Sequence, residues 1–226
     1  MPNNYQITII NQSDRPQTYL LFQNSPKVNP QPGSNVFTNI YQASAIIPPG
    51  GDANFAITSQ WYGINGTSPA AALSTNVKVS TGQGLPVTLG SGATPGTTLG
   101  LTTFNSDGED PEFNPTTPAA AAGNGAFQIV TDSTFTPLNQ NNIFVGLGAP
   151  SPDDPDLITP TVTFPAEPSV TYTIWPHNQW YICTGSFEAG SIIDVQAVGA
   201  KQEVDFENGR AEQTFIQGPN GTYSPA

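Results

Sequence analysis

The chain has 226 residues, of which 17 are acidic and 5 are basic, so its formal net charge is −12. Nucleic-acid binding needs clustered Lys and Arg to neutralise phosphates, and the few scattered bases argue against it. They argue equally against binding to an anionic membrane surface. No stretch approaches the roughly 20 apolar residues of a membrane span. Residues 1–4 lack a signal segment, which favours the cytoplasm, although the scarcity of Lys would suit a secreted protein.

Apolar runs bounded by turn residues follow one another along the chain and predict strands. The expected strands are Tyr5–Ile10, Thr18–Gln23, Val36–Tyr41, Asn54–Tyr62, Asn76–Ser80, Pro86–Leu89, Thr98–Phe104, Phe127–Thr131, Asn142–Leu147, Thr161–Phe164, Val170–Trp175, Trp180–Thr184, Ile192–Val198, Glu203–Phe206 and Gln213–Ile216. Helix patterns are nearly absent, and only Ala70–Leu73 and Ala119–Ala122 are candidates for a single turn. Apolar and polar residues alternate cleanly in Tyr5–Ile9 and Val170–Ile174, so one face of each should be buried and the other wet.

The 22 Gly and 23 Pro residues lie between these runs and indicate turns. Strands at such short spacing, separated by turn clusters, are typical of an immunoglobulin-like β-sandwich. An acidic and then small-residue stretch interrupts the strands near the middle of the chain. The sequence therefore predicts an all-β protein with a first sandwich half (1–113), a linker (114–125) and a second half (126–226), in tandem or fused into one pseudo-symmetric body.

The two halves resemble each other in order and spacing. The matched segments are Tyr5–Thr8 with Phe127–Val130, Ala53–Ile57 with Val170–Ile174, Gln60–Tyr62 with Gln179–Tyr181, Val87–Gly92 with Val204–Gly209, and Asp107-Gly108 with Asn220-Gly221. Their offsets drift by a few residues, as loop insertions would cause. We interpret the matches as a duplicated β unit.

The repeated Gln-Trp-Tyr is the most specific local feature and supplies the candidate ligand-binding residues. Aromatic rings cover the apolar faces of sugars, so an aromatic platform would be formed by Trp61, Tyr62, Trp175, Trp180 and Tyr181. Adjacent residues of a strand point to opposite faces, so one residue of each Trp-Tyr pair should lie in the core and the other outward or at the seam between the halves. Core packing explains the same residues without any ligand.

Other chemistry-bearing residues are isolated. His177 is the only histidine and falls in an expected turn, and one histidine cannot form a three-histidine zinc site. Cys183 is the only cysteine, and its strand context favours a small buried residue. The acidic clusters near residues 107–112 and 153–156 do not match a calcium-binding EF-hand loop. The sequence thus predicts no catalytic residue, no metal site and no cofactor.

Three segments of the first half and one of the second are similar to segments of known proteins. The segments Tyr5–Ser13, Tyr19–Gln23, Val36–Ile40 and Val145–Pro150 resemble a group of small β-rich proteins of fungi and some bacteria. The shared motifs are structural, so the resemblance implies a β fold and no activity.

Low charge, abundant Asn, Gln and Thr, and duplicated β units favour a non-catalytic structural or self-associating protein. Exposed strand edges could then pair between molecules. The alternative is a carbohydrate-binding, lectin-like module that uses the Trp and Tyr residues. An enzyme would have to work through His177 and a nearby acid. The expected partners are copies of the chain or a glycan.

Overall fold

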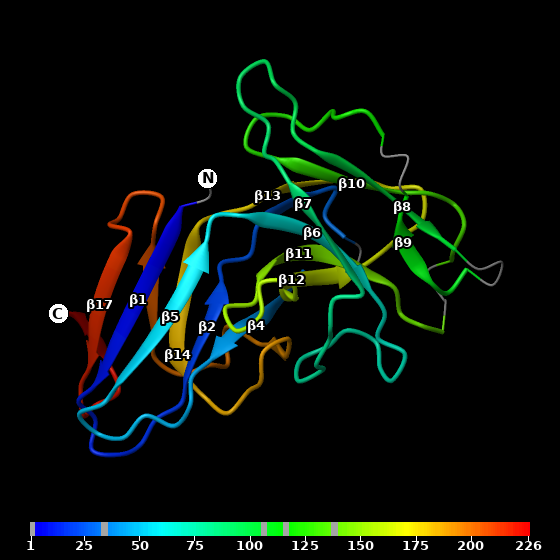
Figure 1. The fold of residues 1–226 in the computed structure, drawn as a ribbon. Coiled ribbons are helices and arrows are strands. Elements are labelled where there is room, and N and C mark those ends of the chain that lie inside the picture. The colour runs from blue at the N-terminus through cyan, green and yellow to red at the C-terminus, as the bar shows by residue number, and fades with distance from the viewer. Residues whose placement is uncertain (1–2, 33–35, 105–107, 115–117, 137–139) are drawn as a thin grey trace.

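The computed structural model describes residues 3–32, 36–104, 108–114, 118–136 and 140–226. These residues form eighteen strands and no helix (Figure 1), which confirms the all-β prediction. The strands are β1 (Asn4–Asn11), β2 (Tyr19–Gln23), β3 (Lys27–Asn29), β4 (Phe37–Ala43), β5 (Asp52–Thr58), β6 (Trp61–Gly66), β7 (Gln83–Val87), β8 (Thr98–Thr103), β9 (Pro111–Phe113), β10 (Phe127–Thr131), β11 (Phe144–Pro150), β12 (Ile158–Pro165), β13 (Thr171–Trp175), β14 (Gln179–Thr184), β15 (Ile192–Ile193), β16 (Lys201–Asp205), β17 (Glu212–Gln217) and β18 (Tyr223–Pro225). Within these ranges, no helix is long and apolar enough to cross a membrane.

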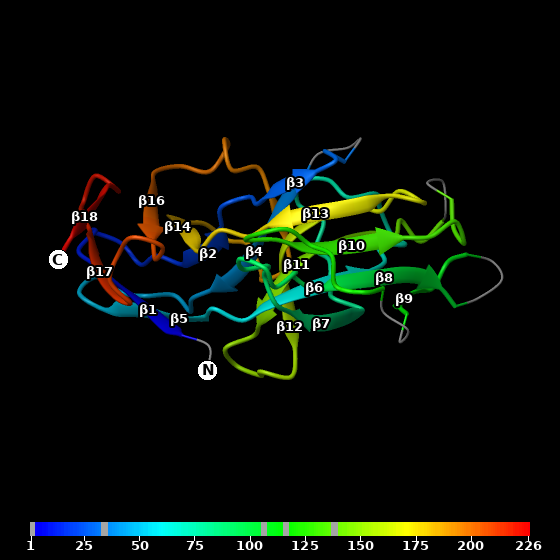
Figure 2. The same ribbon diagram turned by 90° about the horizontal axis from the view of Figure 1, so that it is seen from above.

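Three sheets form a sandwich-like body. The central sheet has the order β16-β14-β2-β4-β12-β11-β6-β7, and β15 pairs with β4 beside this path. A four-stranded sheet, β18-β17-β1-β5, and a five-stranded sheet, β3-β13-β10-β8-β9, cover one face of the central sheet. Seen from above, the sheet with β1 and β17 lies at one end of the molecule and the sheet with β8, β10 and β13 at the other (Figure 2). Apolar residues of all three sheets join in one main core.

Inner strands of the central sheet, such as β2 and β11, are buried on both faces, which explains why their apolar residues do not alternate with polar ones. In β2, Tyr19 and Leu21 point into the main core, whereas Leu20 and Phe22 belong to a smaller cluster on the opposite face. That opposite face is covered by residues 67–82 and 185–200. These two segments contact each other, since the backbone N–H of Ile192 donates to the carbonyl of Val77 at 2.8 Å.

The two smaller sheets have one wet face, as the alternation in the sequence predicts. In β5, the residues alternate strictly between exposed and buried as far as Ile57, so that Ala53, Phe55 and Ile57 enter the main core. β13 behaves in the same way, with Tyr172 and Ile174 fully buried.

Strands from residues 1–113 pair with strands from residues 126–226 in each sheet. β1 lies parallel to β17, and β8 lies parallel to β10. In the central sheet, β14 pairs with β2, β12 with β4, and β11 with β6. Each small sheet and the central sheet therefore need both parts of the chain.

Several strand pairs in the two parts of the chain have matching registers. The pair Tyr5–Ile57 of β1 and β5 corresponds to Phe127–Ile174 of β10 and β13, and Trp61–Val87 of β6 and β7 corresponds to Trp180–Val204 of β14 and β16. The β2–β4 pair has a register shift between Leu21 and Phe22, and the β11–β12 pair has one between Leu147 and Gly148. The Gln6 N–H donates to Ala211 across the first parallel pair, and the Gln128 N–H donates to Thr97 across the second.

The structure differs from the expected elements in the loops. Residues 70–73 and the described residues 118–122 are not helical, and residues 76–80 form a bridge at Lys78 rather than a strand. In the expected linker, Ala122 and Asn124 bridge to Gly96 and Gly90 and are thereby tied to the first part of the chain. Asp107 of the matched Asp-Gly pair lies outside the described residues.

Candidate functional site

Both tryptophans of the repeated Gln-Trp-Tyr lie in the main core. Trp180 has no exposed surface and Trp61 is 7% exposed. The neighbouring tyrosines point to the opposite face of the central sheet, as alternation along a strand requires. There, Tyr62 and Tyr181 are half-buried under the covering segments. The two Trp-Tyr pairs therefore do not converge on one exposed platform.

Trp180 is fixed by packing and by a hydrogen bond. Its ring lies 5.1 Å from the ring of Tyr41, measured between centroids, and its indole N–H donates to Asn178 Oδ1 at 3.0 Å. Burial raises the pKa of the Tyr41 hydroxyl far above its usual range, and that hydroxyl donates to the backbone carbonyl of Pro150. These contacts assign Trp180 to the interior of the body.

Two of the other aromatic candidates, Trp175 and Tyr181, have a lysine over the ring. Lys27 Nζ lies 5.0 Å from the ring centre of Trp175, and Lys201 Nζ lies 5.7 Å from that of Tyr181. Both are cation–π contacts, which place a basic side chain where a sugar ring would stack. Trp175 is distant in sequence from Lys27, and the pairing of β13 with β3 brings them together.

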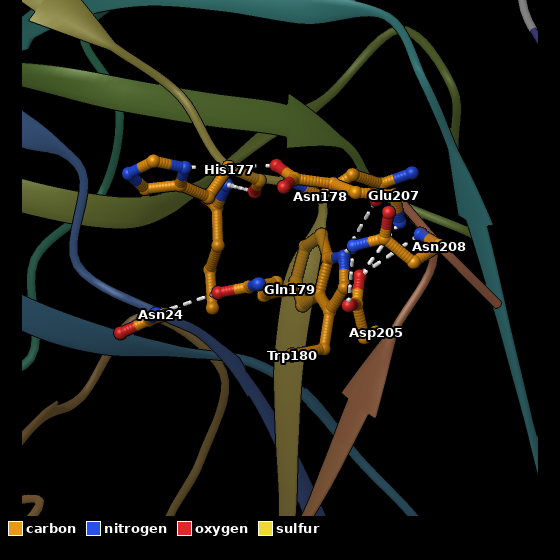
Figure 3. Close-up of polar contacts among 9 residues, drawn as sticks. Asn24, His177, Asn178, Gln179, Trp180, Asp205, Glu207 and Asn208 are labelled. Atoms are coloured by element: carbon orange, nitrogen blue, oxygen red, sulfur yellow. Dashed lines mark hydrogen bonds and ion pairs between the residues drawn. The ribbon is translucent and has the colours of Figure 1, made fainter.

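His177 lies in the loop between β13 and β14, as predicted, and takes part in a polar network with the loop after β16 (Figure 3). Its Nδ1 lies 3.6 Å from Glu207 Oε1, which also accepts the Asn178 N–H at 3.0 Å. Asp205 accepts the side-chain amide of Asn208 at 3.0 Å, and this bond holds the pKa of the Asp205 carboxyl below its usual range. The network joins two loops and contains no serine or cysteine nucleophile.

The described part of the chain has no accessible cysteine nucleophile and no cluster of metal-binding side chains. Cys183 is fully buried, and burial raises the pKa of its thiol to about 11. Among the described residues, no group of three or more His, Cys, Asp or Glu side chains is close enough to hold a metal ion.

The outer edge of β5 is a feature that sequence patterns did not reveal. The Asn11 N–H donates to Gly51 at 2.9 Å, so alternate residues of β5 are hydrogen-bonded to β1. The backbone groups of Asp52, Asn54, Ala56 and Thr58 therefore face the other side, where no strand of the described residues pairs with β5. One of these groups has a side-chain partner, because Gln42 Nε2 donates to the Ala56 carbonyl at 2.7 Å.

Two cavities flank this edge. One, of about 440 Å³, is lined by apolar groups that include Tyr41, Pro150 and Pro152, and the other has about 490 Å³. Both are lined by Tyr41, Ala56, Ser151 and Pro152, so the two cavities adjoin each other along β5, and together we call them the β5 groove. The Thr58 hydroxyl beside it is buried and has no hydrogen-bond partner among the described residues.

The outermost strands of the central sheet have features that prevent pairing. In β7, Pro86 lies opposite Tyr62 at a position whose backbone points away from β6. Because proline has no N–H, this outward position offers no donor to another strand. In β16, Lys201 and Glu203 place charges at the edge. The edge of β5 carries one charge, at Asp52, and no proline.

Comparison with known proteins identifies a family for this chain but no individual similar protein. No curated protein matches the chain, and no solved structure does. The family model described as RhiA matches residues 2–224 and thus runs through β1 to β18. Because the match extends over nearly the whole chain, this protein belongs to the RhiA family.

Proposed function

We propose that this protein is a non-catalytic β protein that associates with other protein chains, its own copies included, through an open sheet edge. The observation that carries the proposal is the outer edge of β5, where the backbone groups of four alternate residues face away from β1 and pair with no strand of the described residues. Unpaired edges of this kind are templates for pairing with another chain. The only cysteine, Cys183, is fully buried, which supports a role that does not use a thiol nucleophile.

The proposal includes two related halves fused into one body. The matched registers of β1–β5 with β10–β13 and of β6–β7 with β14–β16 support a duplication, and the strand pairs that join the halves support fusion over a tandem arrangement. The immunoglobulin-like character of each half stays a prediction. Carbohydrate binding has less support, because Trp61 and Trp180 are in the core and the rings of Trp175 and Tyr181 carry lysines.

Size-exclusion chromatography with light scattering, over a wide range of protein concentration, tests the association. We expect the apparent mass to rise with concentration and the rise to be lost in Ala56→Pro, which removes an outward-facing N–H without breaking a bond to β1. Glu203→Pro is the matched control, since it makes the same change at the edge of β16. A strict monomer at high concentration, or an equal loss in both variants, would contradict self-association through β5.

A further inference from the structure

The chain itself shows what covers the corresponding edge in its second half. β3 pairs antiparallel with β13, with Lys27 opposite Trp175, Val28 opposite Ile174 and Asn29 opposite Thr173. Val28 is 5% exposed and belongs to the main core. This short strand therefore contributes backbone pairing along the edge of β13 and an apolar side chain to the core.

The same positions of β5 pair with no outer strand among the described residues, although Gln42 donates to the Ala56 carbonyl. By the matched registers, Ala56, Ile57 and Thr58 correspond to Thr173, Ile174 and Trp175. β3 lies in the segment between β2 and β4, residues 24–36, whereas the corresponding segment between β11 and β12 is only residues 151–157. The shorter segment lines the β5 groove with Ser151 and Pro152 but adds no strand. The β5 edge therefore lacks a counterpart of β3, the strand that pairs with the corresponding edge of β13.

The groove is also negatively charged. Glu212 lines the cavity that contains Thr58, and Asp153 lines the adjoining one. No Lys or Arg occurs among the residues that line either cavity, all of which lie in the described part of the chain. A basic side chain placed opposite Thr58, where β3 places Lys27 opposite Trp175, would enter a groove whose charged lining residues are all acidic.

From these observations we infer that the β5 groove binds an extended peptide segment of another protein as an added antiparallel strand, with a basic residue opposite Thr58 and an apolar residue opposite Ile57. The inference rests on the proposed function and names the chemistry of the partner. Tyr41 and Pro152 of neighbouring elements line both cavities beside the β5 edge, and the space between them suits a single extended segment. The main-chain bonds would give affinity, and the two side chains would give specificity.

A peptide with the sequence of residues 25–29, Ser-Pro-Lys-Val-Asn, labelled with fluorescein and titrated with the full chain, tests the inference by fluorescence anisotropy. We expect saturable binding. N-methylation of the peptide at its Lys or Asn, whose N–H groups would face β5, should weaken binding about tenfold or more through loss of a hydrogen bond and steric clash. N-methylation at Val, whose N–H would face away, is the matched control and should leave binding within about twofold. These peptides leave the protein unaltered, so the result does not depend on whether a variant folds.

Variants of the protein then locate the site. Glu212→Lys and Ala56→Pro should each weaken binding about tenfold, and Glu203→Pro should leave it unchanged. No saturable binding, or equal effects of all three N-methylations, would overturn the inference. If the peptide fails while self-association persists and depends on Ala56, the inference fails and the proposed function stands. If the peptide binds as expected to a strictly monomeric protein, the inference stands and self-association fails.

Discussion

Replacing Trp180 tests whether this residue is part of the core or part of a ligand-binding surface. The ring is fully buried, stacks on Tyr41 and donates one hydrogen bond to Asn178. Truncating a buried Trp to Ala costs about 3–5 kcal/mol, the ring stack contributes about 1 kcal/mol and the hydrogen bond contributes about 1 kcal/mol. The latter two overlap with the first, so we expect Trp180→Ala to lower the free energy of unfolding by about 4–5 kcal/mol.

Equilibrium unfolding in urea, followed by circular dichroism, measures this loss. Trp180→Phe keeps most of the apolar ring and should cost about 1–2 kcal/mol, which keeps the prediction testable if the Ala variant does not fold. Tyr181→Ala, at the half-buried neighbouring position, is the control and should cost less than Trp180→Ala. A loss below about 1 kcal/mol for Trp180→Ala would refute the assignment of this residue to the core.

Three further predictions concern the thiol, a carboxylate and a glycine. Cys183, whose pKa burial raises to about 11, should resist iodoacetamide at pH 8 in the native protein and react in urea, as followed by mass spectrometry; rapid native labelling would contradict its burial. The depressed pKa of Asp205 means that the native state binds its proton less readily than the unfolded chain, so its contribution to stability is present above about pH 4 and is lost as the pH falls through the depressed value. The difference in unfolding free energy between the wild type and Asp205→Asn should therefore shrink on acidification, and a constant difference from pH 6 to pH 2 would contradict this. A Cβ at Gly146 would lie 2.0 Å from the Val162 carbonyl, whereas one at Gly123 meets nothing within 4 Å, so Gly146→Ala should cost about 1–3 kcal/mol and Gly123→Ala should be nearly neutral in the same urea assay.

The strands of this protein could be predicted because turn residues separate short apolar runs, and a run such as Tyr19–Gln23 reads as a strand whether one or both of its faces are buried. The burial of both faces of β2 could not be predicted, because it depends on residues 185–200, far away in sequence. Short strands such as β3 and β18 were missed since three residues carry too little pattern. Their pairing is determined by neighbours distant along the chain.

The candidate site was predicted only in part. Alternation correctly placed one residue of each Trp-Tyr pair in the core, but residue type alone could not say that Trp180 is completely enclosed. The residues of β5 do not indicate by their pattern that its outer edge is open. A signal exists elsewhere, because the segment 151–157 is shorter than its counterpart 24–36, and it becomes meaningful only when the strands of the two halves have been matched.

Amide hydrogen exchange at two corresponding residues tests the open edge most directly. Ala56 in β5 and Thr173 in β13 both direct their N–H away from the inner partner strand, but only Thr173 is paired with an outer strand, at Asn29. We expect the Ala56 amide to exchange at least about 100-fold faster than the Thr173 amide in the free protein, since paired amides exchange only through opening. Addition of the Ser-Pro-Lys-Val-Asn peptide should slow Ala56 selectively. Equal protection of the two amides in the free protein would contradict an open β5 edge.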